Sequence, residues 1–268
     1  MVPEIRIMVT NNIGGWVMSK FKVSLCSPYP RKGFGPGDIH VDNELDIMRS
    51  VIDAADGDIV VFPEAFLDEF HLNEAAEIAA KSGKWIVSGA RGCLKCRDQI
   101  VILISPDQGV VYSHTKTSLT EGDRAYGSSV GTSIEAVDTP FCRIGTVLCY
   151  EIHFPEVSRI LALDGAELLI NTVGTGMWHE QQFYEWTTVA KCRAIENRCF
   201  VVGCTHYCDP IPMIFAYDPH GRELLLKRDQ HGPFTVEIDT DLIDEKDFLR
   251  DRTPACYGKI SETGSNAQ

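Results

Sequence analysis

The sequence predicts one α/β domain in which helices pack on a layered sheet with mixed strand directions. Short apolar segments typical of buried strands alternate with amphipathic helical segments in the first half of the chain. Hairpin turn signals, such as Pro-Asp-Gln-Gly at 106–109, indicate that some neighbouring strands run antiparallel. No internal repeat, low-complexity tract or Pro/Gly-rich linker divides the 268 residues, a length compatible with one large domain.

Apolar spacing and turn residues give the expected elements. In the N-terminal half we expect helices at 42–57 and 73–83 and strands at 21–26, 58–64, 84–90, 99–106 and 109–116. We expect a loop over 121–129. In the C-terminal half we expect helices at 155–164 and 180–197, strands at 142–149, 166–172, 199–207 and 233–239, and a hairpin at 215–227.

The first helix and the helix at 155–164 show how the boundaries are assigned. Leu45, Met48 and Ile52 recur at helical spacing, and Asp42 or Asn43 provides an N-cap. Pro155 suits the first turn of a helix, where its missing N–H is not needed. Both segments therefore predict helices that cover one face of a sheet.

The composition excludes several classes of protein. Lys plus Arg number 25 against 38 Asp plus Glu, so the net charge of −13 disfavours nucleic acid or an anionic membrane as partner. Apolar runs are too short to span a bilayer. Residues 1–20 lack the apolar segment of a secretion signal, and we expect them to be a native extension or an added leader.

Ten cysteines are scattered along the chain, and several lie inside apolar segments, namely Cys26, Cys142, Cys199 and Cys204. This pattern is typical of reduced thiols in a cytoplasmic protein rather than of a disulfide framework. Two loose groups remain as alternatives for a structural zinc or redox site: Cys93 with Cys96, and Cys204 with Cys208 and His206. Neither has the paired spacing of a zinc finger, so we expect no metal.

Three expected strands end on a reactive side chain: Glu64, Lys116 and Cys149. Taken singly, each has a structural explanation: a solvated carboxylate, an edge-strand lysine and a small apolar filler. Because chemistry in α/β folds gathers beyond strand ends, the three side chains could also converge on one site.

Together these groups would perform acyl transfer through a thioester. A thiol is mostly protonated near neutral pH, so Cys149 needs a base, and the Glu64 carboxylate could take its proton and return it to a leaving amine. Lys116 would stabilise the oxyanion of a tetrahedral intermediate. A histidine is the more usual base for cysteine, but His153 and His179, the only two expected nearby, have no obvious orienting partner.

The sequence around these residues resembles the nitrilase superfamily, the carbon–nitrogen hydrolases. Segments 60–67, 112–119 and 145–170 resemble its glutamate, lysine and cysteine motifs. An Arg-Ala-Ile-Glu-Asn helix within 191–204 and C-terminal segments 217–225 and 236–254 resemble further parts of the family. The similarity is collinear over about residues 21–257, which we take as the domain, and leaves 258–268 as a C-terminal tail.

The resemblance implies a four-layer α-β-β-α sandwich that pairs through a helical face into homodimers or larger homo-oligomers. It implies Glu64 as general base, Lys116 as oxyanion stabiliser and Cys149 as nucleophile, with the backbone N–H of Tyr150 as second oxyanion donor. It also implies a small-molecule amide substrate, release of ammonia or an amine, and neither a metal nor an organic cofactor.

Several positions depart from the family pattern. Ser118 stands two residues after Lys116, where the family usually has histidine. The second acidic position is filled by Glu121 or by Asp123, whose side chain is one methylene shorter. Glu151 stands where the family more often has aspartate or another residue, and we interpret it as a charged group on the rim.

Three further predictions concern the surroundings of the site. Asn171 and Trp178 follow a strand and either line the substrate pocket or serve in packing. Arg193 and Glu196 are three residues apart on one helix, which predicts an ion pair.

The sequence thus predicts a hydrolase of a non-peptide C–N bond in a small amide or carbamoyl substrate. A nitrile-hydrolysing enzyme is one alternative. A catalytically reduced family member that serves as an oligomeric binding protein is another, because the motif histidine is replaced at Ser118.

Overall fold

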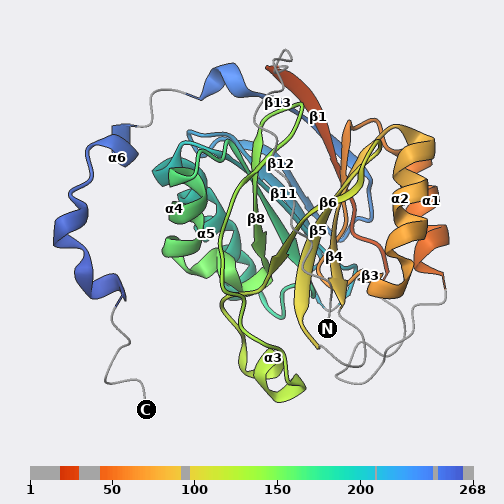
Figure 1. The fold of residues 1–268 in the computed structure, drawn as a ribbon, viewed down its shortest axis with the longest axis horizontal. Helices are drawn as coiled ribbons and strands as arrows, with labels where there is room; N and C mark the ends of the chain where they lie inside the picture. The colour runs from red at the N-terminus through yellow and green to blue at the C-terminus, as the bar shows by residue number, and fades with distance from the viewer. Residues whose placement is uncertain (1–18, 30–42, 92–96, 209, 244–246, 262–268) are drawn as a thin grey trace.

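Two β-sheets lie face to face at the centre of the structure, with helices on the outer face of each (Figure 1). The structure is a computed structural model, and it describes residues 19–29, 43–91, 97–208, 210–243 and 247–261. Its layers run helices, sheet, sheet, helices, which is the α-β-β-α sandwich that the resemblance implies. The predicted fold class is confirmed.

The first sheet has seven strands in the order β13-β1-β2-β4-β5-β6, with β3 beside β4. Its central strands β1, β2 and β4 are parallel, whereas β5, β6 and β13 run antiparallel to their neighbours. The strands are β1 (Lys20–Leu25), β2 (Ile59–Val61), β3 (Leu67–Asp68), β4 (Trp85–Arg91), β5 (Gln99–Ser105), β6 (Gly109–Thr115) and β13 (Phe234–Asp239).

The second sheet has six strands in the order β12-β11-β10-β9-β8-β7. Its central strands β8, β9 and β10 are parallel, and β7, β11 and β12 run antiparallel to their neighbours. The strands are β7 (Val137–Asp138), β8 (Arg143–Leu148), β9 (Leu168–Val173), β10 (Phe200–Thr205), β11 (Met213–Tyr217) and β12 (Glu223–Arg228).

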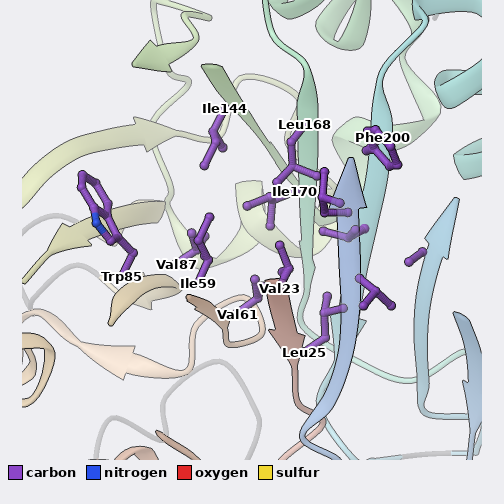
Figure 2. Packing of buried hydrophobic residues seen from close by; sticks show 14 of the residues in the cluster. Val23, Leu25, Ile59, Val61, Trp85, Val87, Ile144, Leu168, Ile170 and Phe200 are labelled. Carbon is purple, nitrogen blue, oxygen red and sulfur yellow. The ribbon is translucent and has the colours of Figure 1, made fainter. Parts of the chain in front are cut away.

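Alternation along the central strands creates the apolar layers. Side chains of a strand point alternately to its two faces. In β2, Ile59 and Val61 therefore pack between the sheets, as Figure 2 shows, while Val60 packs against Met48 of α1 (Glu44–Ala54). Because both faces are covered, the strand is apolar throughout. Burial of each such side chain contributes roughly 1.5–3 kcal/mol to the free energy of folding.

Helices α1 and α2 (Leu72–Ser82) cover the first sheet, and α4 (Pro155–Leu163) and α5 (Glu180–Asn197) cover the second (Figure 1). Leu161 of α4 and Ala190 and Ala194 of α5 pack against Val147 and Leu169 on the outer face of the second sheet. The predicted helices at these four places are confirmed to within a few residues, and Pro155 is the first residue of α4.

The predicted loop at 121–129 is wrong in its first part, because residues Glu121–Tyr126 form the helix α3. Thr120 caps it: its hydroxyl accepts from the N–H of Asp123, whose side chain accepts from the N–H of Thr120. Reciprocal capping stabilises a short helix that its apolar spacing does not reveal.

Short helices complete the described chain. They are η1 (Glu69–His71), η2 (Cys149–His153), η3 (Thr240–Leu242), α6 (Asp247–Arg250), η4 (Pro254–Cys256) and η5 (Gly258–Ser261). None of the helices in the described segments has the length and apolar character of a bilayer-spanning segment.

Strand directions bring several strand ends to one edge of each sheet. In the first sheet, β5 reverses the direction of β4 and β6 reverses it again, so β6 ends at the same edge as β2. In the second sheet, the parallel strands β8, β9 and β10 end together. Loops beyond these ends are the expected place for a site.

Candidate active site

Glu64, Lys116 and Cys149 converge, as the sequence predicts. Lys116 Nζ lies 3.0 Å from Glu64 Oε1, and the Cys149 thiol lies close enough to both groups for their charges to act on it. Glu64 and Lys116 are buried, whereas Cys149 is half-buried. A thiol, a carboxylate and an ammonium, each near the end of a strand, therefore share one site.

Glu64 is held by its backbone. The peptide after β2 continues beside β4, because Gly89 N–H donates to the Pro63 carbonyl at 3.0 Å. A Cβ at Gly89 would lie 2.2 Å from the Glu64 Cα, so only glycine permits this approach. Ala65 follows with a φ of 55°, a left-handed conformation that turns the chain away after the glutamate.

His206, which directly follows β10, supports the backbone of Glu64. Its Nε2 lies 2.9 Å from the Glu64 carbonyl oxygen and donates to it. Burial lowers the pKa of His206 to about 4, so the ring is neutral at physiological pH. The sequence suggested His206 only as part of an alternative metal or redox group, although its position at the end of a strand was a signal for a place beside the site.

Lys116 lies between two carboxylates. Its Nζ is 2.8 Å from Asp123 Oδ2 as well as 3.0 Å from Glu64 Oε1. The capping box of α3 aims Asp123 at the lysine, whereas Glu121 in the first turn is exposed. Of the two candidates for the second acidic position, the structure therefore brings Asp123 to the site, despite its shorter side chain.

Cys149, the first residue of η2, directly follows β8 and has a strained backbone. Its φ of 49° lies in the left-handed region, which for a residue other than glycine costs about 1–3 kcal/mol. Asn171 supports this backbone: its Nδ2 donates to the carbonyls of Val147 at 2.8 Å and Cys149 at 3.3 Å. Trp186 Nε1 donates to Asn171 Oδ1 at 3.1 Å, which fixes the orientation of the amide.

The surrounding charges set the protonation states. Burial raises the pKa of the Cys149 thiol well above its usual range, the Glu64 charge adds to this, and Lys116 opposes it. Burial alone would lower the pKa of Lys116, but the charges of Glu64 and Asp123 and the hydrogen bond to Asp123 outweigh it and raise that pKa. The resting site therefore holds a protonated thiol beside a charged ammonium.

The remaining predicted residues of the site differ in their burial. The Tyr150 side chain is partly exposed, but its backbone belongs to the first turn of η2, where N–H groups have no partner within the helix. Asn171 is fully buried beneath Cys149, while Trp178 is 68% exposed. Substrate contact by Asn171 or Trp178 stays a prediction.

The interpretation of Glu151 as a rim group is wrong, because its side chain is fully buried and accepts a hydrogen bond from His114 Nε2 at 3.0 Å. His114 was also missed as a histidine of the site. The predicted ion pair between Arg193 and Glu196 is confirmed at 2.6 Å, and Arg193 Nε also donates to the Ile152 carbonyl of η2 at 2.9 Å.

The alternative metal groups gain no support from the described residues. In those segments, no three His, Cys, Asp or Glu side chains are arranged to hold a metal ion. Cys93 and Cys96 lie outside the described residues. The cysteines at 26, 142, 199 and 204 are buried, as their apolar surroundings predict.

The backbone of Gly174, which follows β9, lies close to the Glu64 carboxylate. A Cβ at this position would lie 2.6 Å from Glu64 Oε2. We expect Gly174→Ala to displace the carboxylate and lower kcat roughly 10²-fold in steady-state assays. Gly258→Ala, where a Cβ meets nothing within 4 Å, should leave kcat unchanged. Equal rates for the two variants would contradict this account of Gly174.

Comparison with known proteins identifies the family. The family model described as carbon-nitrogen hydrolase matches residues 45–245, which is most of the chain. The chain belongs to the carbon–nitrogen hydrolase family. It is therefore a hydrolase of carbon–nitrogen bonds other than peptide bonds.

Named relatives of this carbon–nitrogen hydrolase include amidases. An (R)-stereoselective amidase of a Pseudomonas species is 28% identical over 78% of this chain and 84% of its own. An omega-amidase of Xenopus laevis is 24% identical over 88% of this chain and 94% of its own.

Solved structures share the fold of this hydrolase at low sequence identity. A carbon-nitrogen hydrolase from Helicobacter pylori has a TM-score of 0.78 at 17% identity and covers 91% of this chain and 99% of its own. An amidase from a Nesterenkonia species, solved in complex with acrylamide, has a TM-score of 0.74 at 18% identity and covers 89% of this chain and 96% of its own.

Proposed function

We propose that this carbon–nitrogen hydrolase cleaves a small amide or carbamoyl substrate through a thioester on Cys149. The observation that carries the proposal is the convergence of three groups: the Cys149 thiol lies beside the charges of Glu64 and Lys116, and Glu64 is 3.0 Å from Lys116. Relatives named as amidases cover most of the chain, which supports an amide rather than a nitrile as substrate.

In the first half of the reaction, Cys149 Sγ attacks the substrate carbonyl carbon and Glu64 takes the thiol proton. A protonated resting thiol makes this base necessary, because the neutral thiol is a weak nucleophile. When the tetrahedral intermediate collapses, the C–N bond breaks and Glu64 delivers the proton to the nitrogen. Ammonia or an amine leaves, and the acyl group remains on sulfur.

In the second half, water attacks the thioester carbon and Glu64 accepts a proton from it. Collapse of the second tetrahedral intermediate breaks the C–S bond, and the sulfur recovers a proton as the acid product leaves. Glu64 thus acts as base and then as acid in each half, which fits its contact with both Cys149 and Lys116.

Both tetrahedral intermediates carry an oxyanion, for which two donors are available. The Lys116 ammonium is fixed beside Cys149, and the Tyr150 N–H lies in the open first turn of η2. Asp123 fills the second acidic position and holds Lys116 at 2.8 Å. Since the two carboxylates keep Lys116 protonated, it acts as a stationary charge and not as a proton donor.

We further propose that the enzyme works as a cytoplasmic homodimer or larger homo-oligomer, without nucleic acid or membrane as partner. Exposed apolar side chains on α4, α5 and α6 support pairing through this helical face, among them Ile160, Leu163, Ile195 and Phe248. Light scattering coupled to size-exclusion chromatography tests the assembly, and a monomer at micromolar concentration would contradict it.

A chromatographic screen of ω-amides, carbamoyl amines and nitriles tests the function. We expect at least one amide or carbamoyl compound to yield ammonia or an amine together with the matching acid. Acid quenching during turnover should trap an acyl adduct on Cys149, visible by intact and peptide mass spectrometry. Unmodified Cys149 and no turnover across the panel would instead favour an oligomeric binding protein, and turnover of nitriles alone would favour the nitrilase alternative.

A further inference from the structure

We propose that Glu151 is a positioning residue that locks the Lys116 and Cys149 segments together, and that His114 holds Glu151 in place. This inference rests on the proposed amide hydrolysis, for which it adds two residues that touch neither the thiol nor the ammonium. Both side chains are buried: Glu151 is 0% exposed and His114 is 3% exposed.

The Glu151 carboxylate accepts hydrogen bonds from four donors. Oε1 accepts from the N–H of Thr117 at 2.6 Å and from its hydroxyl at 2.7 Å. Oε2 accepts from the N–H of Leu148 at 2.8 Å. His114 Nε2 lies 3.0 Å from Oε2 and 3.3 Å from Oε1 and donates between them.

These donors flank the two proposed catalytic groups. His114 and Thr117 lie on either side of Lys116, at the end of β6 in the first sheet. Leu148 directly precedes Cys149, at the end of β8 in the second sheet. One carboxylate therefore bridges the two sheets at the edge where the lysine and the cysteine meet.

The bridge requires an ionised carboxylate. Burial alone would raise the pKa of Glu151, but the His114 hydrogen bond and charge and the bonds from Leu148 and Thr117 outweigh it and lower that pKa. A carboxylate is acceptor-only, so all four donors can be satisfied at once. The strained backbone of Cys149 increases the need for such support, because its φ of 49° must be maintained by neighbours.

The substitution Glu151→Gln tests the bridge with almost no change in shape. An amide has one acceptor oxygen, and its NH₂ group would face either the Leu148 N–H or the Thr117 donors. We expect kcat to fall about 10²-fold with KM within about twofold, because a misplacement near 1 Å has this effect on a reacting geometry.

Comparison of His114→Gln with His114→Leu separates the effect of losing the hydrogen bond to Glu151 from the effect of changing the volume of the side chain. The glutamine amide can donate to Glu151 from nearly the position of His114 Nε2, whereas leucine cannot. We expect His114→Leu to lower kcat about tenfold, the equivalent of one hydrogen bond, and His114→Gln to recover most of that loss.

Asp218→Asn is the matched control. Asp218 is another buried carboxylate, and its Oδ1 accepts from the N–H groups of His220 at 2.9 Å and Arg222 at 2.8 Å. It follows β11, which runs antiparallel to β10, so it lies at the opposite edge of the second sheet. We expect this variant to lose thermal stability, as Glu151→Gln does, while keeping kcat.

A second readout does not depend on turnover. The rate of Cys149 alkylation by iodoacetamide, followed by peptide mass spectrometry, reports whether the thiol still meets its base Glu64. We expect this rate to fall in Glu151→Gln and to stay unchanged in Asp218→Asn. Wild-type kcat and alkylation in Glu151→Gln would overturn the inference, as would a kcat loss in Asp218→Asn equal to that in Glu151→Gln. If the wild-type protein hydrolyses no substrate, the proposed function fails, and the alkylation rates alone decide the bridge.

Discussion

Replacing Cys149 by alanine is expected to reduce kcat by about 10⁶-fold, because loss of a covalent nucleophile removes the entire thioester route. The fold should survive, since alanine fits a half-buried position and suits the left-handed φ of 49° no worse than cysteine does. Steady-state assays on the substrate found in the amide screen measure the loss, and circular dichroism verifies the fold.

Cys192→Ala is the control for this substitution. Cys192 is a free, exposed cysteine of α5 and should be replaceable without effect on turnover. Substantial activity in Cys149→Ala would refute the proposed nucleophile. Activity lost equally in both variants would point to a general sensitivity to cysteine replacement.

The convergence of Glu64, Lys116 and Cys149 could be predicted because it depends on strand ends, which a sequence reveals well. Glu64 and Cys149 follow the buried apolar strands β2 and β8, and Lys116 follows the edge strand β6, which ends at the same edge of its sheet as β2. The family resemblance then supplied the pairing of the two sheets, which no local pattern in the sequence contains.

The supporting residues could not be predicted in the same way. Whether Glu151 faces solvent or the interior depends on the turn of η2, a 3₁₀ helix set by the φ of Cys149 and by contacts from a distant strand. His206 and Asp123 likewise acquire their roles from partners far along the chain, at Glu64 and Lys116. Such long-range contacts have no signature in local periodicity.

The helix α3 shows how a local signal and a distant contact combine. Thr120 and Asp123 form a capping box that could be recognised from their spacing of three residues. The same carboxylate then meets Lys116, so one side chain both begins the helix and completes the ion-pair cluster. The glutamate in this segment, Glu121, remains exposed in the first turn.

The charge balance of the site explains why Lys116 matters for stability as well as for chemistry. Its ammonium is almost fully buried between two carboxylates, at 3.0 Å from Glu64 and 2.8 Å from Asp123. Removing one partner of a buried ion pair leaves an uncompensated charge, which usually costs about 3–5 kcal/mol. We therefore expect Lys116→Met to lower the free energy of unfolding by this amount at pH 7, and kcat by at least roughly 10²-fold through loss of an oxyanion donor.

The stability loss in Lys116→Met should depend on pH in a defined direction. In the wild-type protein Lys116 and the Thr120 hydrogen bonds together outweigh burial and hold the pKa of Asp123 below its ordinary value of 3.8, so this carboxylate stabilises the fold above that pH. Without the lysine, burial is opposed by the Thr120 hydrogen bonds but no longer by Lys116, so the folded-state pKa of Asp123 rises and the variant takes up a proton at a higher pH than the wild-type protein does. The difference in stability between the two proteins should therefore shrink as the pH falls from 7 toward 4.

Lys84→Met is the control that isolates the carboxylate effect in this last experiment. The Lys84 ammonium donates to the carbonyls of Ala55 and Gly57 at 2.9 Å each, and the carboxylate on which its charge acts, Asp56, is exposed and paired with Lys22, so the loss of Lys84 leaves no buried carboxylate without its partner there. Urea denaturation of the wild-type protein and both variants at pH 7 and pH 5 should show a loss that narrows at pH 5 for Lys116→Met and stays constant for Lys84→Met. A loss in Lys116→Met that is the same at both pH values would mean that Asp123 and Lys116 are not coupled in solution.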